Sequence, residues 1–217
     1  LSHNHRGIPV YGKLATTRRR VKWGARRACI RRGIRHICRL PICRSEQKRM
    51  LDRPDSEPAF FAPFVSSVMR VEPAWIDYNG HLNMAYYNVL FDRAVDEVYE
   101  VLGLGLSYVE TTKHSTFTAE VHVRYLRELL VDTPVRVTFQ LLGFDGKRMH
   151  YFEQLFHAEE GWLSATSENM ALNVNMVAKK TAAFPDRVME RLKMMKAAHD
   201  LLPAPDGAGR RIGMTKT

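Results

Sequence analysis

The residues best suited to chemistry lie in one short stretch, which contains Asp77, Gly80, His81 and Asn83. A carboxylate such as that of Asp77 can attack a carbonyl carbon, or deprotonate a water molecule aimed at it. The imidazole of His81 can donate a hydrogen bond or transfer a proton near neutral pH, and Asn83 can hold the carboxylate or a substrate carbonyl. These groups would suit attack on an activated carbonyl compound.

An amphipathic helix is predicted directly after this stretch. Apolar residues recur at four-residue spacing from Leu82 to Val98, and charged residues take the other side. Gly103 suits the C-terminal cap. The first amides of a helix lack intrahelical partners and carry partial positive charge, so they can stabilise an oxyanion beside Asp77. Gly80 would let a substrate approach the backbone there.

Helix capping explains the same residues without any chemistry. Asp, Asn and Gly are the commonest residues immediately before a helix, because their side chains or conformations satisfy its free amides. On spacing alone, capping and catalysis both remain open. Periodicity identifies no substrate.

The pattern around the helix predicts an α+β fold. Four strands with alternating apolar and polar residues follow it, at 115–127, 133–143, 148–159 and 162–176, and the Asp-Gly pair at 145–146 marks a hairpin. An earlier strand ends near Pro73, and a last helix runs from Asp186 to about His199. One long helix before an antiparallel meander can bury its apolar face only across the sheet. Apolar residues on both faces of 148–159 predict a second cover, for which a partner chain is one candidate.

Charge and cysteine divide the chain into parts. Residues 1–50 hold 15 of the 33 basic residues and one acidic residue, together with all three cysteines. The rest carries 18 basic and 22 acidic residues, so the high overall charge belongs to a tail. We expect 1–50 to be a disordered basic tail, or an over-extension of the reading frame with translation starting at Met50. A nucleic-acid-binding arm, an organelle presequence and a metal site are the alternatives. Residues 51–200 form the predicted domain, and 201–217 a flexible C-terminal tail.

Several function classes lack their signatures. No run of about 18 apolar residues predicts a membrane helix, and no secretory signal is evident, so we expect a cytoplasmic protein. The motifs of serine hydrolases, zinc proteases and phosphate-binding loops are absent. The histidines of the body show no metal-ligand spacing, and we predict neither metal nor cofactor.

The stretch from Trp75 to Tyr87, Trp-Ile-Asp-Tyr-Asn-Gly-His-Leu-Asn-Met-Ala-Tyr-Tyr, resembles the hotdog-fold acyl-CoA thioesterases of the 4-hydroxybenzoyl-CoA thioesterase type. The resemblance spans about 62–190. The sequence of this stretch is most similar to the thioesterases linked to carnitine breakdown, which are thought to act on betainyl-CoA. The resemblance implies a five-stranded antiparallel sheet wrapped around one long central helix, and hydrolysis of an acyl-CoA thioester to free acid and CoA.

The resemblance also implies roles for individual residues. Asp77 matches the family's catalytic carboxylate, the amides after Gly80 match the groups that polarise the thioester carbonyl, and His81 and Asn83 match supporting positions. Family members form dimers, often tetramers, by joining sheets edge to edge, with active sites at the interface. Basic residues are candidates for binding the CoA phosphates, namely Arg124, Arg127, Lys147, Arg148, Lys179 and Lys180.

A betainyl group would need a particular kind of pocket. A quaternary ammonium offers no hydrogen-bond donor and is held best by aromatic faces and nearby carboxylates. We predict that Trp75, Tyr78 and Tyr87 contribute to substrate binding with Gly80. Tyr86 and Trp162 are further candidates for the aromatic cage.

Two other functions are weighed against hydrolysis. A hotdog enoyl-CoA hydratase also pairs Asp with His, but Asp77 and His81 are four positions apart, one fewer than that motif leads us to expect. A non-catalytic acyl-CoA sensor with a DNA-binding arm would need a helix-turn-helix in residues 1–50, where no such periodicity appears. We therefore expect the folded domain to bind acyl-CoA and copies of itself, and no nucleic acid or membrane.

Overall fold

The computed structural model describes residues 60–214. The basic tail predicted over 1–50 lies outside the described residues, as do 51–59 and 215–217. Within the described part, no helix is long and apolar enough to cross a membrane. The elements in chain order are β1 (Phe64–Val65), β2 (Met69–Arg70), η1 (Pro73–Trp75), α2 (Met84–Leu102), α3 (Leu106–Thr112), β3 (His114–Tyr125), β4 (Pro134–Phe144), β5 (Arg148–His157), β6 (Leu163–Asn175), β7 (Lys180–Thr181) and α4 (Asp186–His199).

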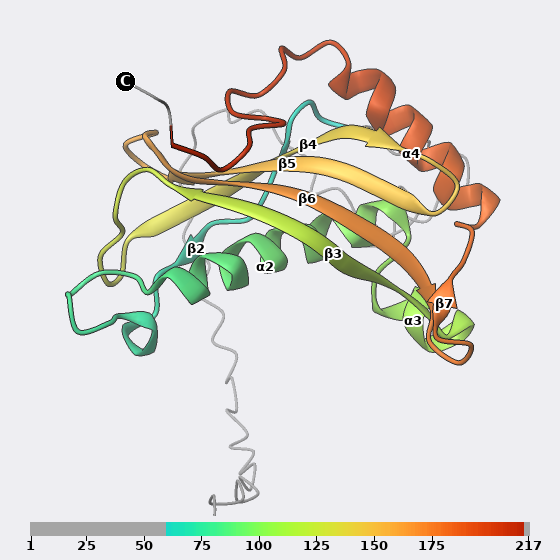
Figure 1. Cartoon of the computed structure of the whole chain (residues 1–217), viewed down its shortest axis with the longest axis horizontal. Coiled ribbons are helices and arrows are strands. Elements are labelled where there is room, and N and C mark those ends of the chain that lie inside the picture. Colours follow the sequence, from blue (N-terminus) through green and yellow to red (C-terminus); the bar gives the residue numbers. More distant parts are fainter. Residues whose placement is uncertain (1–59, 215–217) are drawn as a thin grey trace, which may run out of the picture. The chain divides into compact units, whose positions relative to one another are not determined.

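The strands form one antiparallel sheet in the order β1-β4-β5-β6-β3, with β2 also beside β4 and β7 beside β6 (Figure 1). The four long strands match the predicted ranges to within two residues. The predicted hairpin joins β4 to β5, where the Asp145 carboxylate accepts hydrogen bonds from the amides of Lys147 and Arg148, both at 2.8 Å. The meander predicted from alternation is therefore confirmed.

The first predicted strand is interrupted. β1 and β2 both pair with β4, and Ser66 stands just after β1. The Ser66 amide donates to Val137 O at 2.8 Å, while its hydroxyl accepts from the Val137 amide at 3.0 Å. A side-chain oxygen thus replaces a backbone carbonyl in the ladder, which breaks the strand without leaving the amide unpaired.

Helix α2 lies across one face of the sheet, here called the inner face (Figure 1). It ends at Gly103, whose φ of 79° is the left-handed conformation that glycine adopts without strain. Its buried stripe, which includes Leu90, Ala94 and Val98, packs on inner-face residues such as Val137. The predicted helix and the face it buries are confirmed.

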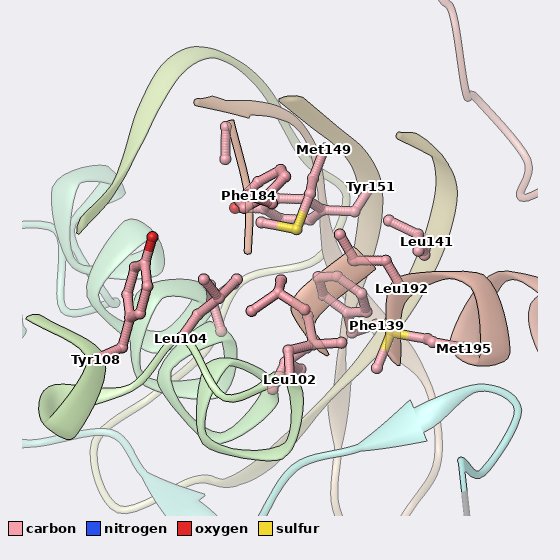
Figure 2. Close-up of a cluster of buried hydrophobic side chains, with 14 residues drawn as sticks. Leu102, Leu104, Tyr108, Phe139, Leu141, Met149, Tyr151, Phe184, Leu192 and Met195 are labelled. Atoms are coloured by element: carbon pink, nitrogen blue, oxygen red, sulfur yellow. The ribbon is translucent and has the colours of Figure 1, made fainter. Parts of the chain in front are cut away.

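Helix α4 packs beside β4 and completes the core. Figure 2 shows Leu192 and Met195 of α4 among the same side chains as Phe139 of β4 and Leu102 of α2. At the end of α4 the buried His199 accepts the Leu141 amide at its Nδ1, 2.8 Å away, and its Nε2 lies 3.2 Å from Phe61 O. Because Nδ1 accepts a hydrogen bond, the proton of the neutral imidazole lies on Nε2, which donates to Phe61 O. Burial lowers the pKa of His199.

The other face of the sheet, the outer face, is partly covered by the chain's own C-terminal segment, residues 200–214. Phe152 points to this face and is only 2% exposed. Its cross-strand neighbours are Gln140 and Glu168. Gln140 Nε2 donates to Pro203 O at 3.3 Å, and the Gly209 amide donates to Glu168 at 2.7 Å. The segment predicted as a flexible tail is thus held against the sheet, where it supplies part of the predicted second cover.

One buried acid stands out in the interior. Glu153 of β5 is 1% exposed and lines a cavity of about 310 Å³ between α2 and β3. One carboxylate oxygen accepts from Asn169 at 3.1 Å, and the other has no partner among residues 60–214. Burial and, to a lesser extent, the Asp92 carboxylate raise the pKa of Glu153 well above its usual value. The fold therefore favours the protonated, neutral form of this side chain.

We expect Glu153→Gln to become progressively more stable than the parent protein as pH rises. The raised pKa means that the folded protein keeps a proton that the unfolded chain releases above about pH 4.3, so the parent's free energy of unfolding falls by about 1.4 kcal/mol per pH unit from there to the folded pKa. Urea unfolding at pH 5 and pH 8, at fixed protein concentration, measures the difference. The exposed Glu159→Gln serves as control, and a pH-independent gap for Glu153→Gln would contradict the raised pKa of Glu153.

Candidate active site

A tight loop brings Asp77 and His81 side by side. Ile76 and Leu82 on either side form an antiparallel bridge. The Asp77 amide donates to His81 O at 3.0 Å, and the Gly80 amide donates to Asp77 O at 3.0 Å. The stretch singled out in the sequence is therefore a closed turn, and the two candidate catalytic side chains, Asp77 and His81, project from adjacent points.

Gly80 is required here by backbone conformation. Its φ of 86° lies in the left-handed region, which L side chains rarely adopt. A Cβ at this position would meet nothing within 4 Å. The glycine thus closes the turn. It does not line the cavity that contains Asp77, so its expected contact with a substrate stays a prediction.

Asn83 caps α2. Its side-chain oxygen accepts the Ala85 amide at 3.0 Å, and its carbonyl accepts the Tyr86 amide at 3.0 Å. Its own amide donates to Trp75 O at 2.9 Å. Asn83 therefore joins the helix start to the segment before the loop. The first helical amide, that of Met84, is left without an intrahelical partner.

A cavity of about 340 Å³ opens where this loop, the start of α2 and the end of β3 meet. Tyr87 and Tyr125 meet edge to face with ring centres 5.0 Å apart, and the Tyr125 hydroxyl donates to Met84 O at 3.2 Å. His81 Nε2 lies 3.4 Å from a Glu128 carboxylate oxygen. The full lining is Asp77, His81, Leu82, Met84, Tyr87, Tyr125, Leu126, Arg127 and Glu128.

The Asp77 carboxylate is half-buried and oriented by its own loop. Its Oδ1 accepts the Asn79 amide at 2.8 Å, and its Oδ2 receives no hydrogen bond from another described residue. Burial raises the pKa of both Tyr87 and Tyr125, so their phenols remain neutral donors. The cavity thus combines one oriented carboxylate, an imidazole and two neutral phenols. Within residues 60–214, no group of three His, Cys, Asp or Glu side chains is arranged to hold a metal ion.

The predicted substrate-binding aromatics are dispersed. Tyr87 lines the cavity, but Tyr78 is 98% exposed and is not in the lining. Trp75 is buried and stacks on Tyr86 at 5.6 Å, and the Arg93 guanidinium lies 4.8 Å from its ring centre. The Arg93 guanidinium thus occupies the face of Trp75 that a substrate cation would need.

Trp162 is occupied in the same way as Trp75. The Arg127 guanidinium lies 3.9 Å from its ring centre, and its indole N–H donates to Glu160 at 2.8 Å. Neither tryptophan lines the cavity that contains Asp77. The five predicted aromatics therefore do not form one cage in this chain.

Five residues of the lining are not among the site residues predicted from the sequence, namely Leu82, Met84, Tyr125, Leu126 and Glu128. Tyr125 had a usable signal, because alternation along β3 places it on the inner face toward α2. Glu128 follows the strand and offers no periodic signal. It reaches the cavity because the Leu82 amide donates to Leu129 O at 2.8 Å, which ties the segment after β3 to the helix start.

Comparison with known proteins identifies relatives of this domain. The family described as the thioesterase-like superfamily matches residues 71–192. A betainyl-CoA thioesterase from Pseudomonas aeruginosa is 39% identical over 144 residues, which cover 66% of this chain and 91% of the relative. An L-carnitine dehydrogenase/betainyl-CoA thioesterase from Rhizobium meliloti is 40% identical over 147 residues, or 68% of this chain. The match spans only 29% of that longer relative.

Solved structures agree with these matches. A hypothetical protein from Staphylococcus aureus, solved in complex with CoA, is 28% identical with a TM-score of 0.66, covering 74% of this chain and all of the other. A putative thioesterase from Pseudomonas putida is 31% identical with a TM-score of 0.63, covering 72% and 99%. The predicted α+β hotdog fold and the predicted resemblance to betainyl-CoA thioesterases are both confirmed. The chain belongs to the thioesterase-like superfamily.

Proposed function

We propose that this protein hydrolyses an acyl-CoA thioester to the free acid and CoA, with Asp77 as the catalytic carboxylate. The observation that carries the proposal is the position of Asp77, which lines a cavity beside the first residue of α2 with one carboxylate oxygen unpartnered among the described residues. A carboxylate next to the positive end of a helix suits attack on a carbonyl that becomes an oxyanion. The thioesterase names of the relatives support the same reaction.

The proposed mechanism assigns each lining group a task. Asp77 Oδ2 removes a proton from the water that attacks the thioester carbonyl carbon, or attacks that carbon itself to form an acyl-Asp77 anhydride, which water then hydrolyses to the free acid. The Met84 amide, which lacks an intrahelical acceptor, stabilises the developing oxyanion. His81, held beside Glu128, gives a proton to the departing thiolate of CoA. Asn83 acts through the helix cap, so its role is positioning.

We expect Asp77→Asn to fold normally and to lose at least about 100-fold in kcat, the scale of removing a positioned catalytic group. The asparagine oxygen can still accept the Asn79 amide, so the loop should persist. A thiol-release assay measures the loss, and circular dichroism with thermal unfolding verifies the fold. Activity close to that of the parent would assign Asp77 to turn formation alone. Hydration of an enoyl-CoA without thiol release would favour the hydratase alternative.

The acyl group we propose is betainyl, or a similar short cationic group. The named activity of both relatives supports this choice. The cavity offers the aromatic rings of Tyr87 and Tyr125 together with the carboxylates of Asp77 and Glu128. A quaternary ammonium needs aromatic faces and negative charge, because it has no hydrogen-bond donor. The proposed cation subsite therefore keeps Tyr87 from the predicted aromatics, adds Tyr125, and leaves out Trp75 and Trp162.

Betainyl-CoA should be hydrolysed about tenfold more efficiently than its uncharged isostere 3,3-dimethylbutyryl-CoA, the scale of a cation–π contact assisted by a carboxylate. The two acyl groups share a shape, so kcat/KM for the pair isolates the charge; acetyl-CoA serves as the small reference. Glu128→Gln should lower kcat/KM for the cationic substrate more than for the neutral one, because both substrates lose the Glu128 contact that holds His81 but only the cationic one loses an opposite charge. Equal kcat/KM for the isosteres, or betainyl-CoA no faster than acetyl-CoA, would exclude the cation subsite.

We further propose that the protein self-associates through β3. This strand lies at one edge of the sheet and pairs only with β6 among the described elements. It exposes apolar side chains, with Phe117 50% and Val121 47% accessible. An exposed apolar edge is a template for pairing with a second copy. The Asp77 cavity lies at the end of this edge, near Tyr125. The tetramer and the cytoplasmic location expected from the sequence stay predictions.

The double variant Phe117→Lys, Val121→Lys should shift the protein from dimer to monomer, because lysines on an edge strand oppose strand pairing. Size-exclusion chromatography with light scattering measures the mass. Leu106→Lys, Val177→Lys changes two apolar residues away from β3 that are more exposed, at 66% and 77%, and this variant should remain dimeric. A parent protein that is monomeric at micromolar concentration would refute the edge-to-edge dimer.

A further inference from the structure

We propose that the C-terminal segment builds the subsite for the phosphate groups of CoA, in which Arg210 and Arg211 act together with Arg124 of β3. The proposal rests on the proposed function, because it concerns the far end of the same thioester substrate. The C-terminal segment would thus have a function, although the sequence predicted a flexible tail over 201–217.

The segment is fitted to the outer face of the sheet. The Gly209 amide donates to the Glu168 carboxylate at 2.7 Å, and the other Glu168 oxygen lies 2.8 Å from His150 Nε2. Gly207 has a φ of 89° and lies against Arg124, so that a Cβ at this position would overlap the Arg124 guanidinium. The left-handed turn at Gly207 and the contact with Arg124 together place the following arginines over β3.

Two cavities lie between the segment and the sheet, and they share Arg210, Arg211 and Ile212. The first, of about 480 Å³, is lined on the sheet side by residues that include His122 and His150. The second, of about 370 Å³, adds Arg124, Tyr125, Leu126 and Gly213. The segment thereby turns an exposed sheet surface into a groove of a size that small organic groups can enter.

The charge of this groove suits phosphate. No ion pair joins Arg124, Arg210 or Arg211 to another residue of 60–214. The acidic residues that line it are Glu120 and Glu168, and Glu168 is already engaged by the Gly209 amide and His150. Three guanidinium groups thus remain for an anion, and guanidinium is the side chain best matched to phosphate oxygens.

The groove adjoins the Asp77 cavity at the end of β3, and this arrangement suits CoA better than an unrelated anion. Tyr125 and Leu126 line both the second groove cavity and the cavity that contains Asp77. A substrate whose thioester lies at Asp77 can therefore pass around the end of β3 to Arg124. CoA has this form, with its thiol at one end of a long pantetheine arm and its phosphates at the other.

The same geometry separates the basic residues predicted to bind CoA. Arg124 lies in the groove. Arg127 is directed over Trp162, and Arg148 is paired with Asp145 in the β4–β5 hairpin. The remaining candidates of that set, Lys147, Lys179 and Lys180, are in neither cavity of the groove. Arg210 and Arg211 had no signal in the sequence, because nothing there indicates that the segment returns to the sheet.

The test compares two thioesters of the same acyl group, the CoA thioester and the pantetheine thioester, which lacks the nucleotide and its phosphates. For Arg210→Ala, Arg211→Ala we expect KM for the CoA substrate to rise about tenfold with kcat unchanged, because two charge-assisted contacts are lost. KM for the pantetheine substrate should not change. Lys179→Ala, Lys180→Ala, a second pair of adjacent exposed cations, should behave like the parent.

An unchanged KM for acyl-CoA, or an equal rise for both substrates, would overturn the phosphate subsite while the proposed hydrolysis still stands. Calorimetric titration of the Asp77→Asn protein with CoA gives a readout that needs no turnover: substitution of Arg210 and Arg211 in that background should weaken binding about tenfold, and unchanged binding would also overturn the subsite. A parent protein that releases thiol from neither substrate would instead refute the proposed function.

Discussion

The burial of α2 against the inner face of the sheet is the constraint on which the rest of the structure depends. Leu90 and Val98 are fully buried along its stripe, and each contributes about 1.5–3 kcal/mol relative to an exposed side chain. A helix held in this way cannot slide, so its first residue has one position. The Asn83 cap and the Leu82–Leu129 hydrogen bond then fix the loop of Asp77 beside the end of β3.

Periodicity was sufficient for the elements that pack by a regular face. The stripe of α2, the alternation in β3 to β6 and the Asp-Gly hairpin each placed an element to within two residues. The interruption at Ser66 and the short α3 were missed for local reasons: a side-chain oxygen replaces a ladder carbonyl at Ser66, and α3 is too short to show a period. The packing of residues 200–214 was missed because it depends on polar contacts with Gln140 and Glu168, which are distant in the sequence.

The residues of the candidate site also fall into two groups: those that a local sequence pattern predicts, and those that only the fold brings together. Asp77, His81 and Tyr87 lie around one cavity because they belong to one turn and the helix after it. Tyr125 and Glu128 lie 38 to 51 positions further along the chain. The register of β3 brings Tyr125 to the cavity, and the Leu82–Leu129 hydrogen bond brings Glu128. The sequence also could not show which aromatic faces are free. Arg93 over Trp75 and Arg127 over Trp162 are internal cation–π contacts, so an abundance of aromatic residues near a motif did not amount to a binding cage.

The proposed substrate carries opposite charges at its two ends, and the protein orders its own charges to match. A quaternary ammonium would lie near Asp77 and Glu128, on the side of β3 that faces α2. The phosphates of CoA would lie near Arg124, Arg210 and Arg211, on the other side of the same strand. Reversed binding would set like charges against each other at both ends. Tyr125 and Leu126 line both the groove and the Asp77 cavity, so the end of β3 separates a positively charged region from a negatively charged one. Only one direction of substrate entry therefore brings the thioester to the Asp77 carboxylate.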